Sequence, residues 1–382
     1  MSTVIEIGMD VHANSFSLCA MEVPVGRGGK PRILAEGQVP ADYRKVLKWA
    51  EENILVHASP DNPIEVEFGY EAGCLGYSLR NQLTEAGVPC IILAPTTMMV
   101  TKGPRIKTDR RDAQQIAHCL ATGSYSPVHV LDETDEGVRA YMRMREDTRN
   151  LLKTVKQQIN AQCMALGHHY EGTKWTQAHL AWLKNLKISD HYQELALRER
   201  LVHYHALTAD IERYDKEIER QIAVMPRYKE NVRMLGCLLS MTALNAVAVL
   251  CEIGDFTRFQ KANIFGAYLG LAPGEHSSGT HTCRTGISKA GNSTLRRKLV
   301  LAAQSICRGR VGEKPKALKE RQMGNPPEII AYADHANKRM RRKYYRLIAN
   351  GKNRNVAVTA VARELACFIW GIMTGNTQLK AA

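Results

Sequence analysis

Two carboxylates lie three residues apart in an otherwise basic stretch of the chain. Asp109 and Asp112 stand in the run KGPRIKTDRRDAQQIAHCL, residues 102–120, at the start of a segment with helical spacing. Residues three apart share one face of a helix. Such a pair either stabilises the start of the helix through its dipole or forms part of a metal site with ligands from elsewhere in the chain.

Two further acids strengthen the metal interpretation. Asp10 stands in IGMDVH, in the middle of an alternating apolar segment, and Glu71 stands in GYEAG. A buried acid among apolar neighbours costs free energy unless a cation or a hydrogen-bond donor offsets it. Carboxylate oxygens favour Mg²⁺ or Mn²⁺, and two such ions about 3.5–4 Å apart can clamp a phosphodiester. We therefore predict a metal site made of Asp10, Glu71, Asp109 and Asp112.

The elements that must position these acids follow from the periodicity of residues 1–130. Alternating or apolar runs predict strands, and segments with helical spacing predict the helices between them. The expected order is three strands (3–12, 16–23, 32–39), a helix (42–54), a strand (63–73), a helix (75–87), a strand (88–95) and a helix from 109. A three-stranded meander followed by two crossover strands is the order of an RNase H-like mixed α/β sheet. In that sheet the first and fourth strands are neighbours, which would gather the four acids at one end.

The rest of the chain is predicted to be mostly helical. Apolar residues between 207 and 222 step by three and four, which indicates a helical seam: Leu207, Ile211, Tyr214, Ile218 and Ile222. This seam fits either an intramolecular helical hairpin or a dimerising coiled coil. Residues 167–190 interrupt the helical pattern as an inserted lobe. From residue 226 a second helical domain begins, in which a Gly/Ser-rich loop containing EHSSGTH leads into a basic helix.

Charge is distributed unevenly along the 382 residues. The chain holds 52 Lys+Arg and 38 Asp+Glu, and residues 281–382 alone hold 21 basic and 5 acidic residues. A basic C-terminal quarter predicts a polyanionic partner, either DNA or RNA. Ten cysteines without a CxxC pair predict a reduced protein with no structural zinc site. No signal peptide and no apolar run of about 18 residues is evident, so we expect a cytoplasmic, nucleoid-associated protein with no membrane partner.

Five short motifs resemble one known family. GMDVH, YEAG, KTDRRDA, LGLAPGEHSSG and GISKAGNSTLRRKL occur in this order over residues 1–130 and about 226–305. They resemble the DEDD transposases of insertion-sequence group one hundred and ten, the bridge-RNA-guided recombinases. The resemblance implies a RuvC-like catalytic domain at 1–130, a helical coiled-coil linker and dimerisation region at 131–225, and a transposase domain with a nucleophilic serine at 226–382. It also implies a structured guide RNA and a homo-oligomer, either a dimer or a tetramer.

The family pattern places its serine directly before the glycine of EHSSGTH. This selects Ser278, with Ser277 as the second choice. A free serine hydroxyl is a weak nucleophile and needs a base or a metal to activate it. Basic residues near the acids and after the serine are the candidates for holding nucleic-acid phosphates: Lys107, Arg110, Arg111, Arg284, Lys289, Arg296, Arg297 and Lys298.

The function expected from these residues is site-specific recombination of donor and target DNA by a transposase that moves its own insertion sequence. Ser278 would form a covalent ester with DNA, beside Mg²⁺ held by the four acids. Because the serine and the acids fall in different domains, two protomers could share one site. Two other classes fit the same charge pattern. A Holliday-junction resolvase-like nuclease would need the acids but not Ser278, and a non-catalytic nucleic-acid-binding scaffold would need neither.

Overall fold

The computed structural model describes residues 3–23, 31–99, 108–278 and 281–378. The chain divides into two compact units, Met1–Val130 and Leu131–Ala382. The first unit is a mixed sheet with helices on its faces, and the second is mostly helical.

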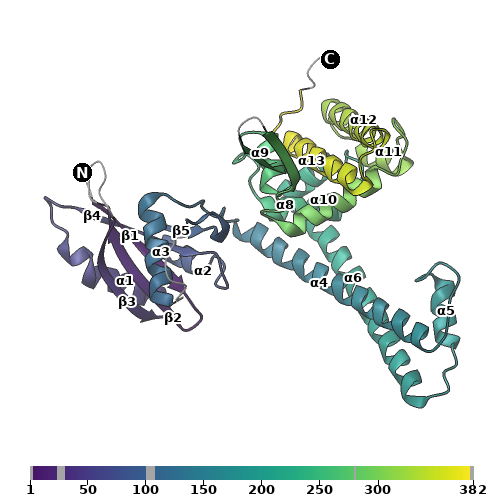
Figure 1. The fold of residues 1–382 in the computed structure, drawn as a ribbon, viewed down its shortest axis with the longest axis horizontal. Coiled ribbons are helices and arrows are strands. Elements are labelled where there is room, and N and C mark those ends of the chain that lie inside the picture. Colours follow the sequence, from purple (N-terminus) through teal and green to yellow (C-terminus); the bar gives the residue numbers. More distant parts are fainter. Residues whose placement is uncertain (1–2, 24–30, 100–107, 279–280, 379–382) are drawn as a thin grey trace. The chain divides into compact units, whose positions relative to one another are not determined.

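The sheet of the first unit has five strands (Figure 1). They are β1 (Thr3–Val11), β2 (Ser15–Glu22), β3 (Arg32–Pro40), β4 (Ile64–Glu71) and β5 (Cys90–Leu93). Their order in the sheet is β3-β2-β1-β4-β5. The pairs β1–β2 and β2–β3 are antiparallel, whereas β1–β4 and β4–β5 are parallel. This confirms the predicted meander with two crossover strands.

Helices cover both faces of this sheet. One face packs Ile5, Ile7 and Met9 of β1 into a core that includes residues of α1 (Tyr43–Asn53) and α2 (Ser78–Glu85). The opposite face carries Cys19 and Met21 of β2 against α3 (Asp109–Thr122). Successive side chains of a strand point to opposite faces, so the alternating sequence serves both layers. Short 3₁₀ turns follow α1 and β5, at Leu55–His57 and Pro95–Thr97.

The backbone of α3 lies unusually close to the sheet. A Cβ on Gly8 of β1 would lie 2.2 Å from the backbone nitrogen of Ala117, and one on Gly69 of β4 would lie 2.8 Å from a methyl group of Leu120. Gly8 and Gly69 are partners in the parallel register, and both lie under α3. Residues two positions further along a strand share the same face. The glycine pair therefore directs Asp10 and Glu71 toward the α3 side.

We expect Gly8→Ala to lower the free energy of unfolding of the first unit by about 3 kcal/mol. The added methyl group would meet backbone atoms of α3, which cannot move aside as a flexible side chain can. Urea unfolding followed by circular dichroism measures the change. Gly73→Ala is the matched control, because its Cβ would meet only the Glu71 carbonyl oxygen at 3.7 Å. Equal unfolding midpoints for the two variants would contradict this account of the packing.

The second unit begins with two long helices, α4 (Glu133–Ala165) and α6 (His191–Val224), which pack on each other within one chain (Figure 1). Tyr141 of α4 meets Tyr214 of the predicted seam edge-to-face, with 5.8 Å between ring centroids. Arg145, which is buried, forms a two-nitrogen contact with the carboxylate of Asp215. The intramolecular hairpin is therefore observed. A coiled coil between two chains stays a prediction.

The inserted lobe packs against the ends of α4 and α6 in a small core, which contains Leu183 of the lobe, Ile159 of α4 and Leu197 of α6. Helix α5 (Gln177–Asn185) places His179 among aromatic rings, where its Nδ1 accepts a hydrogen bond from the backbone nitrogen of Trp175 at 3.0 Å. The His179 ring stacks on Trp182 with centroids 5.8 Å apart. His179 therefore has a packing role in the lobe.

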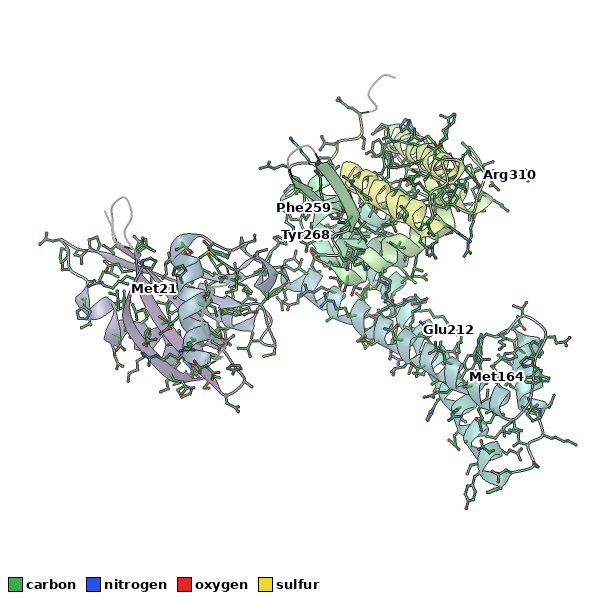
Figure 2. The ribbon with its side chains drawn as sticks, in the orientation of Figure 1. Met21, Met164, Glu212, Phe259, Tyr268 and Arg310 are labelled. Atoms are coloured by element: carbon green, nitrogen blue, oxygen red, sulfur yellow. The ribbon has the colours of Figure 1, made fainter. Side chains whose placement is uncertain are left out.

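The remaining helices surround a common core (Figure 1). They are α7 (Pro226–Leu235), α8 (Ala243–Ile253), α9 (Ala262–Tyr268), α10 (Ser293–Ile306), α11 (Lys316–Gln322), α12 (Pro327–Ala349) and α13 (Arg354–Met373). Phe259 and Tyr268 lie side by side at its edge, with ring centroids 5.1 Å apart (Figure 2). Among the described helices, α13 alone is long and apolar enough to cross a membrane, but 61% of its apolar window is buried in the unit. Val361, Leu365 and Ile369 place it in the core.

The predicted Gly/Ser-rich loop is wrong, because this stretch forms a β-hairpin. Strand β6 (Pro273–Ser278) pairs antiparallel with β7 (His281–Ile287), and Ser278 lies opposite His281. The sequence of β7 contains Thr282, Thr285 and Ile287, and such β-branched residues favour strands. Cross-strand pairing outweighs the glycine and serine residues that suggested a loop.

Candidate functional site

Two of the predicted acids meet at the end of β1. Asp10 is the eighth residue of the nine-residue strand, so its predicted place in the middle was wrong, because the strand starts at Thr3 and ends at Val11. Its side chain is 19% exposed, and its Oδ2 lies 3.2 Å from Nε2 of His12. The same Nε2 lies 3.7 Å from Oδ1 of Asp109. One imidazole thus joins the strand acid to the helix acid.

The start of α3 fixes the two helix acids. Thr108 is the N-cap, and its side chain accepts a hydrogen bond from the backbone nitrogen of Arg111. Asp109 and Asp112 then occupy the first turn, where the helix dipole favours negative charge. Burial raises the pKa of Asp10, the charge of His12 lowers it, and the charges of Asp112 and Asp109 raise it further. The net direction is upward, so the ionised form of Asp10 lacks full compensation within the protein.

Glu71 is the third predicted acid at this edge of the sheet. It is the last residue of β4, it is exposed, and it follows the pair Met9–Tyr70 in the register with β1. Ligand atoms of Asp10, His12 and Asp109 all lie within 4.8 Å of one another, and Glu71 and Asp112 do not belong to that group. The structure thus gathers Asp10 and Asp109 tightly and places Glu71 beside Asp10 at the same edge.

His12 was not among the site residues predicted from the sequence, although it lies in this group. The signal was available in GMDVH, because residues two apart in an extended segment point to the same side. Its side chain is 55% exposed, and it is a nitrogen donor among oxygen donors. Carboxylate oxygens suit Mg²⁺ and Mn²⁺, and imidazole is a ligand of the later transition metals. The negative charge of Asp10 is not fully balanced by positive groups of the protein. Together with the neighbouring acids, it forms a set of oxygen ligands that fits a divalent cation.

The candidate serine lies on a separate element, in the second unit. Ser278 is the last residue of β6, and Ser277, the second choice, precedes it opposite Thr282. The two arms of the hairpin are joined to each other at its base: the backbone nitrogens of Ser288 and Lys289 donate to the carbonyl oxygens of Ala272 and Gly270, at 2.9 and 3.1 Å. The acids therefore belong to the first unit of the chain and the serine belongs to the second.

Comparisons with known proteins identify this combination. A model described as "Transposase", of the DEDD group of IS110, matches residues 7–165. A second model, "Transposase IS116/IS110/IS902 family", matches residues 238–318. The "Putative transposase y4qE" of Sinorhizobium fredii is 35% identical over 372 residues, 96% of this chain and 87% of that protein. The chain belongs to the IS110 family of transposases.

Further relatives are similar to this IS110-family transposase. The "Transposase for insertion sequence element IS1533" of Leptospira borgpetersenii is 26% identical and covers 91% of this chain and 97% of its own length. The RuvC structure of Thermus thermophilus matches 32% of this chain and 99% of its own, with 15% identity and a TM-score of 0.23.

Several predicted phosphate-binding residues of the transposase form ion pairs within the protein. Arg110 donates to Oε2 of Glu36 on β3 from its Nε at 3.0 Å, and Gln114 donates to the other oxygen at 2.6 Å. The hydrogen bond from Arg110 is the main cause that lowers the pKa of Glu36. Arg110 thus ties α3 to the edge of the sheet. Lys107 lies outside the described residues.

The basic helix α10 has a similar internal role. Nη1 of Arg296 donates to the carbonyl oxygens of Leu269 and Ala290, at 3.0 and 2.9 Å. Arg297 and Lys298 both contact Glu146 of α4. Burial alone would raise the pKa of Glu146, but the hydrogen bond and charge of Lys298 and the charge of Arg297 hold it below its ordinary value. Arg284 and Lys289 lie on β7 and just after it.

Proposed function

We propose that this transposase cuts and rejoins donor and target DNA through a covalent phosphoserine intermediate formed by Ser278. The observation that carries the proposal is the meeting of Asp10 and Asp109 at the end of β1, with Glu71 at the adjacent strand end. An under-compensated acid cluster on this sheet supports a phosphoryl-transfer site. The family motif before Gly279 supports the choice of serine.

Asp10, Glu71, Asp109 and Asp112 would hold divalent cations, Mg²⁺ or Mn²⁺. When bound, such ions polarise the phosphate and stabilise developing negative charge on oxygen. Asp10 would be the central ligand, because its side chain is 19% exposed, against 56% for Asp109, and it lies on the strand. His12 would orient Asp10 through the 3.2 Å contact between Nε2 and Oδ2.

The reaction is two successive transesterifications. Oγ of Ser278 forms a bond to the scissile phosphorus while the bond from that phosphorus to one deoxyribose oxygen breaks. The serine loses its proton to a base, and the departing DNA oxygen gains one, which leaves a free DNA hydroxyl. A hydroxyl oxygen of a second DNA end then forms a bond to the same phosphorus while the bond from phosphorus to Oγ of Ser278 breaks. The attacking hydroxyl loses its proton to a base, and Oγ regains one, which restores the free serine. Because the phosphodiester energy is kept in the ester, the exchange needs no ATP.

Both parts of the site must reach the same phosphate. Ser278 and the acids belong to different units of the chain, so a homo-oligomer, a dimer or a tetramer, would allow the serine of one chain to serve the acids of another. We further propose that a structured guide RNA selects the DNA. The excess charge of residues 281–382 supports RNA and DNA binding alike. Equal affinity for the noncoding RNA that flanks the element and for a scrambled RNA would refute the guide.

The direct test of the chemistry is to trap the adduct. Purified transposase is mixed with donor and target DNA, flanking RNA and Mg²⁺, and the reaction is stopped with SDS. We expect DNA that stays attached to protein, and mass spectrometry should place the nucleotide on Ser278. An adduct on Ser277 would move the nucleophile to the earlier serine. An adduct on a residue other than these two, or strand exchange with no adduct at any time point, would refute the serine mechanism.

A further inference from the structure

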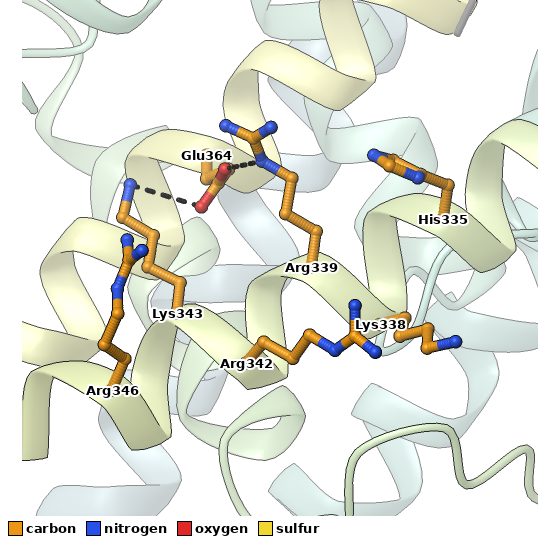
Figure 3. Close-up of a pocket in the computed structure, with 7 residues that line it drawn as sticks. All are labelled: His335, Lys338, Arg339, Arg342, Lys343, Arg346 and Glu364. Atoms are coloured by element: carbon orange, nitrogen blue, oxygen red, sulfur yellow. Dashed lines mark hydrogen bonds and ion pairs between the residues drawn. The ribbon is translucent and has the colours of Figure 1, made fainter. Parts of the chain in front are cut away.

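A strongly basic groove lies on helix α12, and none of the residues of the proposed reaction lines it (Figure 3). It has a volume of about 600 Å³ and is lined by His335, Lys338, Arg339, Arg342, Lys343 and Arg346 of α12 and by Glu364 of α13. The α12 residues recur every three or four positions, so they share one face of the helix. Another face of α12 is buried, through residues such as Ala336 and Met340. The basic residues thus form a continuous row along the exposed side.

Two residues of this row, Arg339 and Lys343, form ion pairs with Glu364 of α13. Glu364 is buried, with 7% of its side chain exposed. Its Oε1 accepts a hydrogen bond from Nε of Arg339, and its Oε2 lies 3.2 Å from Nζ of Lys343 (Figure 3). These ion pairs fix the positions of two cations before any ligand arrives. Fixed cations lose less conformational entropy when they bind a charged partner.

The groove keeps a large positive charge after these pairs are counted. Five cationic side chains and one carboxylate line it, a net of four positive charges with His335 neutral. Lys338, Arg342 and Arg346 are exposed and stand four residues apart, and like charges at that spacing destabilise a helix. A polyanion in the groove would remove this repulsion.

The side chains that line the groove indicate which polyanion it binds. Guanidinium groups bind phosphate oxygens in pairs, and lysine binds them as a point charge. Asn and Gln side chains, which read adenine, are absent from the groove residues described here. Among the bases, arginine and lysine bind guanine, whereas phosphate oxygens are present at every step of any duplex. The row from 335 to 346 is about 16 Å long at 1.5 Å per residue, the rise of roughly four or five phosphates of one duplex strand. DNA is the polymer on which a transposase acts.

We propose that the α12 groove, defined by Lys338, Arg339, Arg342, Lys343 and Arg346, binds the phosphate backbone of duplex DNA without reading its sequence. The groove holds the duplex by charge and leaves site selection to other parts of the complex. Phosphate contacts set position and register and carry no sequence information themselves.

The test uses the full-length protein and a fluorescent duplex of scrambled sequence, with the dissociation constant measured between 50 and 300 mM salt. The variant Lys338→Gln/Arg342→Gln/Arg346→Gln should weaken binding about tenfold to a hundredfold, equally for all duplex sequences, and lower the slope of log K against log salt by about 2–3. The matched control, Lys45→Gln/Lys319→Gln/Lys352→Gln, removes the same charge from exposed positions elsewhere. It should change the slope by less than one.

A charge-preserving variant guards against misfolding as the cause. Lys338→Arg/Arg342→Lys/Arg346→Lys should bind duplex DNA with nearly the wild-type salt slope. Equal weakening in the groove and control variants would overturn the proposal, since net charge alone would then explain the loss. A groove variant that lost affinity for a structured RNA and kept its affinity for duplex DNA would also overturn it, because the occupant would then be RNA.

Discussion

Replacing Ser278 by alanine should abolish the covalent protein–DNA adduct and reduce strand transfer at least about a thousandfold. On the proposed mechanism, the substitution removes only the oxygen that would attack phosphorus, and no other hydroxyl can form the ester from the same atom position. Gel electrophoresis after SDS denaturation measures the adduct, and a joint-molecule assay measures strand transfer. Ser277→Ala is the matched control, since it removes the same group one residue earlier on β6, and it should retain both activities.

The same pair of variants separates the proposed recombinase from a nuclease. A resolvase-like enzyme would cut by activated water, so Ser278→Ala would still nick DNA at the wild-type rate and no adduct would form in any variant. If Ser277→Ala instead lost the adduct while Ser278→Ala kept it, the nucleophile would be the earlier serine. Each outcome assigns the chemistry to a different residue or to none.

Replacing Asp10 by asparagine should lower DNA cleavage at least about a thousandfold while it raises thermal stability. On the proposed chemistry, activity falls because a carboxylate that would hold the metal loses its charge. Stability rises because asparagine is nearly isosteric and carries no charge toward Asp109 and Asp112, whose charges disfavour the ionised form of Asp10. A cleavage assay and a thermal melt without metal measure the two effects. Asp61→Asn, on an exposed turn of the same unit, should change neither.

A second measurement on Asp10→Asn does not depend on activity. Ligands that bind the native state raise the melting temperature according to their concentration and affinity. Addition of Mn²⁺ or Mg²⁺ should therefore raise the Tm of the wild-type protein and leave Asp10→Asn and Glu71→Gln nearly unchanged. If both variants kept full transposition and metal-induced stabilisation, the acids would have no catalytic role.

Much of the first unit was predictable because its signals are local. Strands such as β1 and β4 alternate between two packed faces, and their order follows from the succession of strand and helix patterns. Position within an element was less predictable: Asp10 lies near the strand end, where the site can open. The β6–β7 hairpin was missed because its pairing, rather than its glycine and serine content, decides its structure.

The use of individual charges could not be predicted from local patterns. Arg110 pairs with Glu36, 74 residues away in sequence, and Arg297 pairs with Glu146, 151 residues away. A basic motif specifies that charge is present but not which acid the fold will bring to it. His12 was within reach of the sequence, since its spacing from Asp10 places the two on one side of β1.

The hairpin that carries Ser278 has a consequence for the timing of the reaction. A two-stranded ribbon has little stability of its own. At its base, Ser288 and Lys289 join the two arms, and Arg296 of α10 donates to the carbonyl oxygens of Leu269 and Ala290 beside them. Ser278 ends β6, at the opposite end of the strand from this base. On the proposed chemistry, we therefore expect the serine to reach its reactive position only after the DNA has bound.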